Sequence, residues 1–291
     1  MLDTRMETFL TVCRTMNFTR AAELLNMTQP AVSQQIHFLE DWYGTPLFLR
    51  ERKRLTLTPA GEVLRQSMES LRNDDRAVRR RMAESMAARN TLTFGVTRTV
   101  GEYAIVPSLA RLIQRHPDTD FHIRYGNTET LLAALHSGDI DFAIVEGYFQ
   151  AAQYHTLLYR REAYIAVASA QHVFARPVRR LRDLTGERLL VREPGSGTRA
   201  VLTRALAVQN LSIHDFERLA EVEDIHTIVS LLQQDCGISF LYRAAVEREL
   251  RSGELKEIQL EDFSVSHDFT ALWHRDSIFT GEYSAIIEEL R

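Results

Sequence analysis

The sequence predicts a multidomain protein in which a small all-α segment at the N-terminus precedes a larger α/β region. The chain has 291 residues, which is long for one domain. Residues 18–40 are typical of two short helices joined by a tight turn. From Thr91 onward, short apolar strands alternate with helices, and this alternation indicates a mostly parallel sheet with covering helices.

The second helix of the N-terminal pair is expected to bury one face and to offer the other to a partner. Thr28 stands at an N-cap position, and Pro30 falls in the first turn, where its missing N–H costs little. An apolar stripe at i, i+4 and i+7 spacing consists of Val32, Ile36 and Leu39. The opposite face holds uncharged donors and acceptors, namely Gln29, Ser33, Gln34 and His37.

Polar side chains of this length suit base edges in a major groove, so the pattern predicts a helix-turn-helix that reads DNA. Pro30 and Ala31 would add apolar contacts of the kind that a thymine methyl group accepts. The alternative is a pair of packed helices in an ordinary globular protein. That alternative accounts for the apolar stripe but leaves the polar face unexplained.

A basic segment, Arg50-Glu51-Arg52-Lys53-Arg54, follows between Phe48 and the strand-like residues 55–57. A hairpin here would form a wing whose four cations contact phosphates or the minor groove. A solvated basic loop is the alternative. Residues 1–89 contain 14 Lys and Arg against 11 Asp and Glu, a net charge of +3, whereas the whole chain carries −4. The positive charge is therefore local, as expected for a DNA-reading head on an acidic body.

A long helix is predicted next, because residues 62–89 contain neither proline nor glycine. Apolar residues recur there at alternating four- and three-residue spacing, with Asp75 breaking the seam: Leu64, Met68, Leu71, Val78 and Met82. This spacing is typical of a coiled coil and predicts pairing with a second copy. A single amphipathic helix packed on its own body is the alternative.

The α/β region is expected to begin with strands at 92–96, 121–125 and 142–145, separated by helices over 105–115 and from a Thr128 cap to Gly138. A strand at 164–168 would cross into a second subdomain, and the chain would return near 267–273. The second subdomain is expected to contain strands at 189–191 and 238–241. A last helix is expected over 283–290.

Ligands of such sheets bind beyond the carboxyl ends of strands. The candidate ligand-binding segments are therefore the three that follow predicted strands, residues 97–102, 146–148 and 192–199. In the third segment, Gly195 and Gly197 allow close backbone approach, and Ser196, Thr198 and Arg199 supply hydroxyls and charge where a helix begins. This combination favours an anion. The alternative is a glycine-rich turn before an ordinary capped helix. Glu146 would meet a ligand amine or pair with Arg98.

Several other classes of protein find little support. No apolar run is long enough to span a membrane, and the first residues lack the apolar core of a signal peptide, so we expect a cytoplasmic protein. Cys13 and Cys236 lie in apolar helical patterns and are expected to be reduced, buried thiols. An α/β enzyme is the main competing function, but Gly-x-Ser-x-Gly and His-Glu-x-x-His are absent and the histidines are scattered. We therefore expect no catalytic residue, no metal and no cofactor.

Residues 1–59 closely resemble the winged helix-turn-helix of LysR-type transcriptional regulators. The matching residues keep one register over the segment: residues 18–22, 28–33, Leu39-Glu40, Gly44, 46–48 and 57–61. The later chain also looks like this family. The resemblance implies an all-α winged helix-turn-helix (1–59), a linker and dimerisation helix (60–89) and an α/β, two-lobed, periplasmic-binding-protein-like effector domain (90–291). Lobe I would comprise about 90–163 and 268–291, and lobe II about 164–267.

The expected function is that of a sequence-specific DNA-binding transcriptional regulator, modulated by a small, anionic effector between the lobes. The expected DNA-binding residues are Thr28, Gln29, Pro30, Ala31, Ser33, Gln34, His37, Arg50, Arg52, Lys53 and Arg54. The expected effector-binding residues are Thr97, Arg98, Thr99, Val100, Glu146, Gly147, Ser196, Gly197, Thr198, Arg199 and Ile225. Further expected partners are promoter DNA and the chain itself as a dimer or tetramer, with RNA polymerase as an open candidate. A regulator with a vestigial cleft that answers to no ligand, and a free-standing solute-binding protein, are the remaining alternatives.

Overall fold

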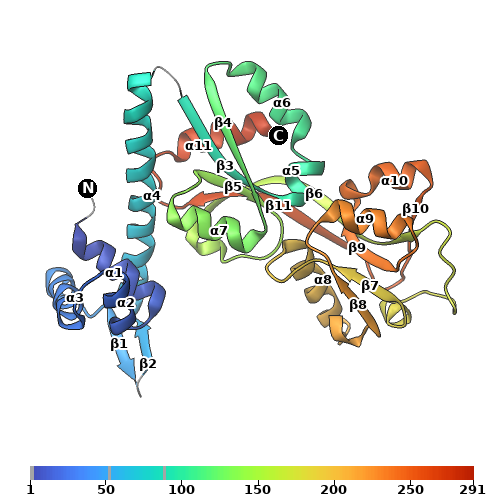
Figure 1. Ribbon diagram of the computed structural model, residues 1–291, viewed down its shortest axis with the longest axis horizontal. Coiled ribbons are helices and arrows are strands. Elements are labelled where there is room, and N and C mark those ends of the chain that lie inside the picture. Colours follow the sequence, from blue (N-terminus) through green and yellow to red (C-terminus); the bar gives the residue numbers. More distant parts are fainter. Residues whose placement is uncertain (1–2, 52–53, 88–89) are drawn as a thin grey trace.

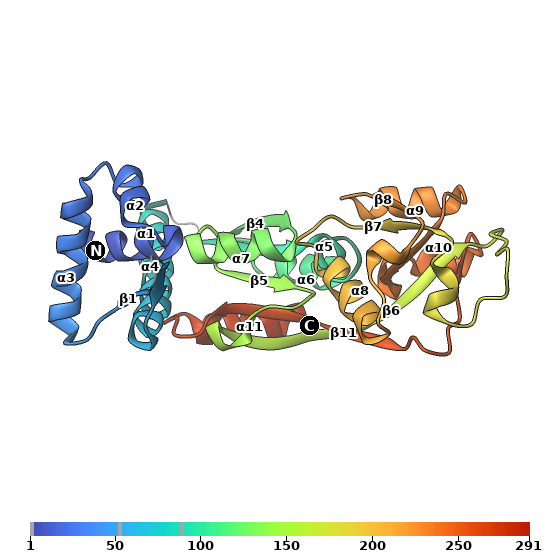
Figure 2. The same ribbon diagram turned by 90° about the horizontal axis from the view of Figure 1, so that it is seen from below.

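The computed structural model describes residues 3–51, 54–87 and 90–291. A helical head, the long helix α4 (Pro59–Ala87), a first α/β lobe and a second α/β lobe follow one another in a row (Figures 1 and 2). Within the described residues, no helix is long and apolar enough to cross a membrane.

The head consists of α1 (Thr4–Thr15), α2 (Phe18–Leu24) and α3 (Gln29–Tyr43), followed by a hairpin of β1 (Phe48–Glu51) and β2 (Arg54–Leu57). As predicted, the Thr28 hydroxyl caps α3 by accepting a hydrogen bond from the Ala31 N–H at 3.4 Å. The predicted apolar stripe of α3 is buried, and it packs against α1 and α2 in a core that includes Phe9, Val12 and Ala21. The predicted helix-turn-helix and hairpin are therefore confirmed as structure.

The seam predicted along α4 divides into two parts. Leu64 and Met68 belong to the hydrophobic core of the head, so they are not free to face a second copy. This part of the coiled-coil prediction was wrong, because the spacing of apolar residues does not show which neighbour covers them. Leu71, Val78 and Met82 are 47%, 38% and 66% exposed.

One mixed sheet runs through both lobes in the order β4-β3-β5-β11-β6-β9-β7-β8, with β10 paired to β6. The prediction of a mostly parallel sheet was wrong, because the strands that cross between the lobes pair antiparallel with their neighbours. Its strands are β3 (Asn90–Thr97), β4 (Thr119–Gly126), β5 (Phe142–Val145), β6 (Tyr154–Ser169), β7 (Arg188–Val191), β8 (Arg218–Glu221), β9 (Ile238–Tyr242), β10 (Leu255–Glu257) and β11 (Val265–His274). The long antiparallel strands β6 and β11 are the two crossings between the lobes. The predicted lobe boundaries fall inside these two strands.

Helices cover the sheet in each lobe (Figure 1). Lobe I contains α5 (Arg98–Tyr103), α6 (Val106–Arg115), α7 (Thr128–Ser137) and α11 (Thr280–Leu290); lobe II contains α8 (Gly197–Val208), α9 (Ile225–Gln233) and α10 (Glu247–Ser252). Single 3-10 turns are η1 (Ala151–Gln153), η2 (Leu181–Leu184), η3 (Ile213–Asp215) and η4 (Arg243–Ala245). One cluster of buried apolar side chains extends from β3 in lobe I to β7 and α8 in lobe II.

Two local predictions require correction. Asn127, not Thr128, caps α7, because its side chain accepts the hydrogen bond from the Thr130 N–H at 2.9 Å. Cys236 lies in the turn after α9, not within a helix. Both Cys13 and Cys236 are free thiols, as predicted, but they are half-buried and not buried. Partial burial raises the pKa of Cys13 to about 12.

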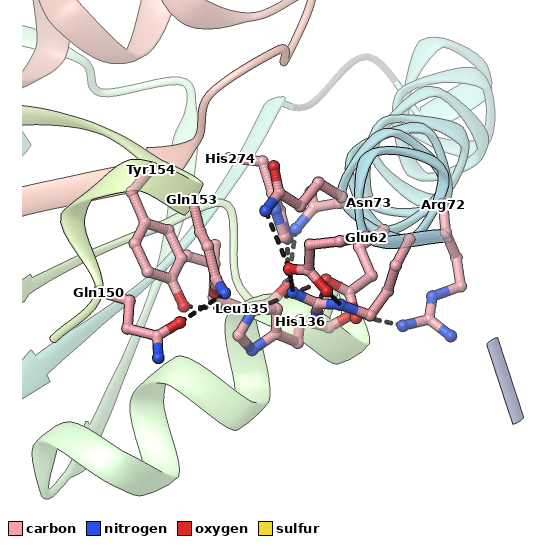
Figure 3. Close-up of polar contacts among 12 residues, drawn as sticks. Glu62, Arg72, Asn73, Leu135, His136, Gln150, Gln153, Tyr154 and His274 are labelled. Atoms are coloured by element: carbon pink, nitrogen blue, oxygen red, sulfur yellow. Dashed lines mark hydrogen bonds and ion pairs between the residues drawn. The ribbon is translucent and has the colours of Figure 1, made fainter. Parts of the chain in front are cut away.

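A polar contact that the sequence did not suggest joins α4 to the end of α7 (Figure 3). The buried Asn73 amide donates to the Leu135 carbonyl at 2.9 Å, and the Arg72 guanidinium donates to the His136 carbonyl at 2.7 Å. The last carbonyls of a helix have no partner within the helix, and the donors from α4 bind two of them. The Leu135 carbonyl also accepts the N–H of Gly138, which caps α7. Positive charge beside a helix C-terminus is also favourable.

Further polar contacts surround the hydrogen bonds of Asn73 and Arg72. His274 on β11 contacts the same Leu135 carbonyl at 3.2 Å, and Tyr154 contacts His136 at 3.1 Å. The buried Asp74 carboxylate accepts hydrogen bonds from Ser277 Oγ at 2.7 Å and from the Ile278 N–H at 2.9 Å. The helix that leaves the head is thus fixed to lobe I by buried hydrogen bonds.

Candidate nucleic-acid interface and interlobe cleft

The outward face of α3 carries the predicted polar row. Gln29, Gln34 and His37 are exposed, and Ser33 is half-buried. Gln29 Nε2 donates to Ser33 Oγ at 2.8 Å, which orients the glutamine side chain along the helix. Gln29, Ser33 and His37 border a groove of about 520 Å³ that continues to Asn17 and to the hairpin.

The hairpin is held beside α3 by Glu40. Its Oε1 accepts hydrogen bonds from the main-chain N–H of Leu47 at 2.8 Å and of Phe48 at 3.2 Å, and its Oε2 lies 3.2 Å from His37 Nδ1. The exposed side chains of Arg50 and Arg54 therefore project from a wing of fixed position. Arg52 and Lys53, which were predicted to contact phosphates or the minor groove, are outside the described residues.

Contacts at the base of the wing explain why Thr58 and Gly61 stand in the sequence Thr-Pro-Ala-Gly at the start of α4. Thr58 Oγ1 caps α4 by accepting from the Gly61 N–H at 2.8 Å and donates to the Pro46 carbonyl at 2.7 Å. A Cβ on Gly61 would overlap the Leu47 carbonyl oxygen, so only glycine fits where α4 leaves the wing.

The cleft between the lobes contains a group of threonine hydroxyls around Glu146. Thr99 Oγ1 donates to Glu146 Oε1 at 3.0 Å, Thr198 Oγ1 donates to the same oxygen at 3.3 Å, and Thr97 Oγ1 donates to Oε2. We call these three threonines the hydroxyl cradle. Thr97 and Thr99 belong to lobe I, whereas Thr198 lies in the first turn of α8 in lobe II.

The cradle is closed by direct contact between the lobes. A Cβ on Gly147 would collide with the Cα of Gly197, and a Cβ on Gly197 would overlap the main-chain oxygen of Glu146. Thr128 Oγ1 donates to that same oxygen, and Glu146 itself is only 2% exposed. Burial of the carboxyl group raises the pKa of Glu146, an effect that the hydrogen bonds from Thr97 and Thr99 partly offset.

The two arginines predicted at the cleft lie where the lobes meet, but carboxylates of lobe II engage both of them. Arg199 donates to the Arg192 carbonyl at 2.9 Å and pairs with Glu221 at 2.5 Å, because the helical turn directs its side chain along lobe II. Arg98 lies 4.0 Å from Asp224, so the suggested pairing of Glu146 with Arg98 was wrong.

Other predicted cleft residues are buried within the lobes. Val100 and Ile225 pack in hydrophobic clusters, with 0% and 1% of their surface exposed, which leaves them no free surface in this closed arrangement. Ser196 is the buried N-cap residue of α8, and its hydroxyl makes no capping hydrogen bond.

An open groove of about 580 Å³ adjoins the cradle, between α7 of lobe I and α8 of lobe II. Leu132, Tyr148, Pro194 and Ala200 contribute to its walls. The guanidinium of Arg204 lies 4.5 Å from the centre of the Tyr148 ring. Apolar walls with a few polar groups are typical of small-molecule sites.

Comparison with known proteins agrees with this division of the chain. Residues 4–62 match the family model described as "Bacterial regulatory helix-turn-helix protein, lysR family", and residues 87–291 match "LysR substrate binding domain". The chain belongs to the LysR family. It is therefore a DNA-binding transcriptional regulator with an effector-binding domain, and not an enzyme.

Individual LysR-family proteins resemble the chain over most of its length. The regulator CfxR of Cupriavidus necator is 31% identical, with 93% of this chain and 83% of that protein covered. The regulator CysL of Bacillus subtilis is 28% identical, with 89% and 87% covered. The structure of full-length LysG from Corynebacterium glutamicum with bound effector Arg has a TM-score of 0.60 at 18% identity, with 100% and 98% covered, and shows the shared fold.

Glu40, Asn127 and Thr128 of this LysR-family chain are positioning residues that were not predicted from the sequence. Asn127 Nδ2 reaches across to Glu193 of lobe II at 3.4 Å, in addition to its capping role. The Asn-Thr pair at the start of a helix that follows a strand was the available signal, since such residues favour helix N-termini. Their contacts with the other lobe could not be inferred from that signal.

Proposed function

We propose that this LysR-family regulator places α3 in the major groove of operator DNA, with the wing on the adjacent backbone. The observation that carries the proposal is the exposed row of Gln29, Gln34 and His37 beside Arg50 and Arg54. Amide side chains read adenine edges, and arginines contact phosphates without regard to sequence. Thr28, Pro30, Ala31 and Ser33 complete the proposed DNA-contacting set. As a DNA-binding regulator, the protein would act in the cytoplasm.

We further propose that two copies pair through the exposed apolar side chains of α4, Leu71, Val78 and Met82. Pairing places two heads on one duplex and adds their contacts. A Val78→Glu variant is expected to shift the sedimentation coefficient toward that of a single copy. Arg79→Glu, one residue further along the same helix, is the matched control. An unchanged assembly in Val78→Glu would contradict this interface.

The proposed effector site is the meeting place of the two lobes, where the cradle and the adjoining groove lie. An anionic effector, as predicted, would enter the groove, and the guanidinium of Arg204 would supply positive charge there. Arg199 is too engaged with Glu221 to serve as the first ligand of an anion. A melting-temperature increase with carboxylate metabolites in wild type, absent from Arg204→Ala, would support this placement.

Helix α7 offers a physical link between that site and the head. Its first residue, Thr128, contacts Glu146 in the cleft, and its last carbonyls accept hydrogen bonds from Arg72 and Asn73 of α4. A ligand that binds two lobe arrangements with different affinity would move α7 and therefore α4. The arrangement of two paired heads, and with it the preferred DNA geometry, would then change.

Gln34→Ala tests the proposed DNA reading. This variant should lose about 1–3 kcal/mol of binding to the operator and little of its binding to random duplex. The matched control is Arg251→Ala, which removes an exposed arginine from lobe II. Equal losses on operator and random DNA for Gln34→Ala would contradict the assignment of α3.

A further inference from the structure

The carboxyl group of Glu146 has the surroundings of a bound ligand. It is almost fully buried, and each of its oxygens accepts hydrogen bonds from threonine hydroxyls of the cradle. The contributing threonines come from both lobes, as expected for a group enclosed by lobe closure. The side-chain carboxylate of Glu146 thus occupies the position where hydroxyl donors from both lobes converge, which a free ligand would otherwise occupy.

The charged groups around Glu146 disfavour the binding of a second anion. The cation that acts on it electrostatically is Arg192, whose guanidinium is engaged by Glu193 at 2.8 Å and 3.0 Å. The buried Tyr164 donates its hydroxyl to the Thr198 carbonyl at 2.9 Å, so it supplies no donor for an incoming group there. An additional anion in the cradle would meet a carboxyl group and no free cation, which is unfavourable in a buried site.

We propose that Glu146 is a built-in ligand of the interlobe anion position, so that the lobes close on the chain's own carboxyl group and the cradle rejects small free anions. The inference rests on the proposed function of the cleft as effector site. It assigns Glu146 as the residue that determines effector specificity. A small inorganic anion or acetate does not act through the cradle, and the effector acts from the adjoining groove between α7 and α8.

Removal of the carboxyl group should turn the cradle into a site for free acetate. In Glu146→Ala, acetate replaces the missing carboxyl group and finds the hydroxyls of Thr97, Thr99 and Thr198. We expect a saturable rise in melting temperature with sodium acetate, measured on the full chain against sodium chloride at equal ionic strength. Calorimetry should give acetate binding at least roughly tenfold tighter than to wild type.

Three controls separate occupation of the cradle from simple charge effects. Glu146→Gln keeps a neutral side chain of the same size in place and should bind no acetate. Glu129→Ala removes an exposed carboxylate from the rim of the groove and should also bind none. Thr198→Val added to Glu146→Ala removes one donor from lobe II and should weaken the acetate binding. If Glu146→Ala does not fold, Glu146→Ser is titrated in its place.

Two results would overturn the inference. One is saturable binding of acetate to wild type that matches the binding to Glu146→Ala. The other is a folded Glu146→Ala or Glu146→Ser that shows no saturable acetate binding. The titration contains no DNA, so its failure is distinguishable from a failure of the proposed DNA reading, which is measured on the wild-type chain with duplexes.

Discussion

The Asn73 amide of α4 donates a hydrogen bond to the main-chain carbonyl of Leu135 in the last turn of α7, at a distance of 2.9 Å. The same amide nitrogen lies 3.4 Å from the Ile140 carbonyl, and Asn73 is 4% exposed. One buried side chain of the linker helix therefore serves two carbonyls of lobe I. The head and lobe I are joined at this point by more than their covalent connection.

Asn73→Ala should destabilise the protein by about 1–3 kcal/mol, because it removes a buried donor that serves the Leu135 and Ile140 carbonyls. The Leu135 carbonyl would keep the Gly138 N–H and His274 as partners. The free energy of unfolding in urea measures this loss. Arg79→Ala on the same helix breaks an exposed pair with Asp75 and should leave stability nearly unchanged, because solvent screens such pairs. If the two variants were equally stable, the contact between α4 and lobe I would contribute nothing.

Gly197→Ala should destabilise the closed arrangement of the lobes by about 1–3 kcal/mol, because the new Cβ would overlap the Glu146 main-chain oxygen. Gly186→Ala is the matched control, since a Cβ there meets open space. Denaturant unfolding and small-angle scattering of both variants measure stability and lobe opening. A Gly197→Ala protein with wild-type stability and shape would show that the lobes do not need this close approach.

Stability should fall on acidification because of His274. Burial, with His136 nearby, holds the pKa of His274 at about 4, below its usual 6.5. Between these two values the unfolded chain binds a proton that the folded chain does not. Stability is therefore complete above about pH 6.5 and decreases as pH falls toward 4, by up to about 3 kcal/mol.

His274→Gln removes this titration while keeping a donor for the Leu135 carbonyl. Its free energy of unfolding should change less than that of wild type between about pH 7 and about pH 5. His214→Gln, at an exposed position in lobe II, is the control and should retain the wild-type profile. If the free energy of unfolding of His274→Gln varied with pH as that of wild type does, the assignment of this pH dependence to His274 would be contradicted.

Arg50→Ala should weaken binding to operator and to random duplex alike and reduce the salt slope by about 1, because a phosphate contact releases counterions without reading sequence. Fluorescence anisotropy across a series of salt concentrations gives both quantities. A loss confined to operator DNA would instead place Arg50 at a base edge.

Local patterns predicted much of this molecule. The Thr28 cap, the stripe of Val32, Ile36 and Leu39, and the paired wing depend on neighbours within a few residues, and such signals are read directly from spacing. The same holds for the strands that begin lobe I. Their alternation with helices determines the parallel pairing of β3 with β4 and β5.

Contacts between distant segments were not predictable in this way. Leu64 and Met68 have coiled-coil spacing but pack in the head, and Arg199 has the right position for an anion but pairs with Glu221. The enclosure of Glu146 depends on lobe closure, which brings Thr198 to it from a position far along the chain. Spacing alone contains no information about which surface will cover a given face.

DNA reading by α3 is tested by binding of the wild-type, full-length protein to the intergenic region upstream of its own gene. Affinity is titrated with salt and compared with random duplex of equal length. We expect preferred binding to a site with two symmetric halves and a lower affinity for random duplex at every salt concentration. Equal affinity for that region, for genomic fragments and for random duplex, with and without metabolite extract, would contradict it.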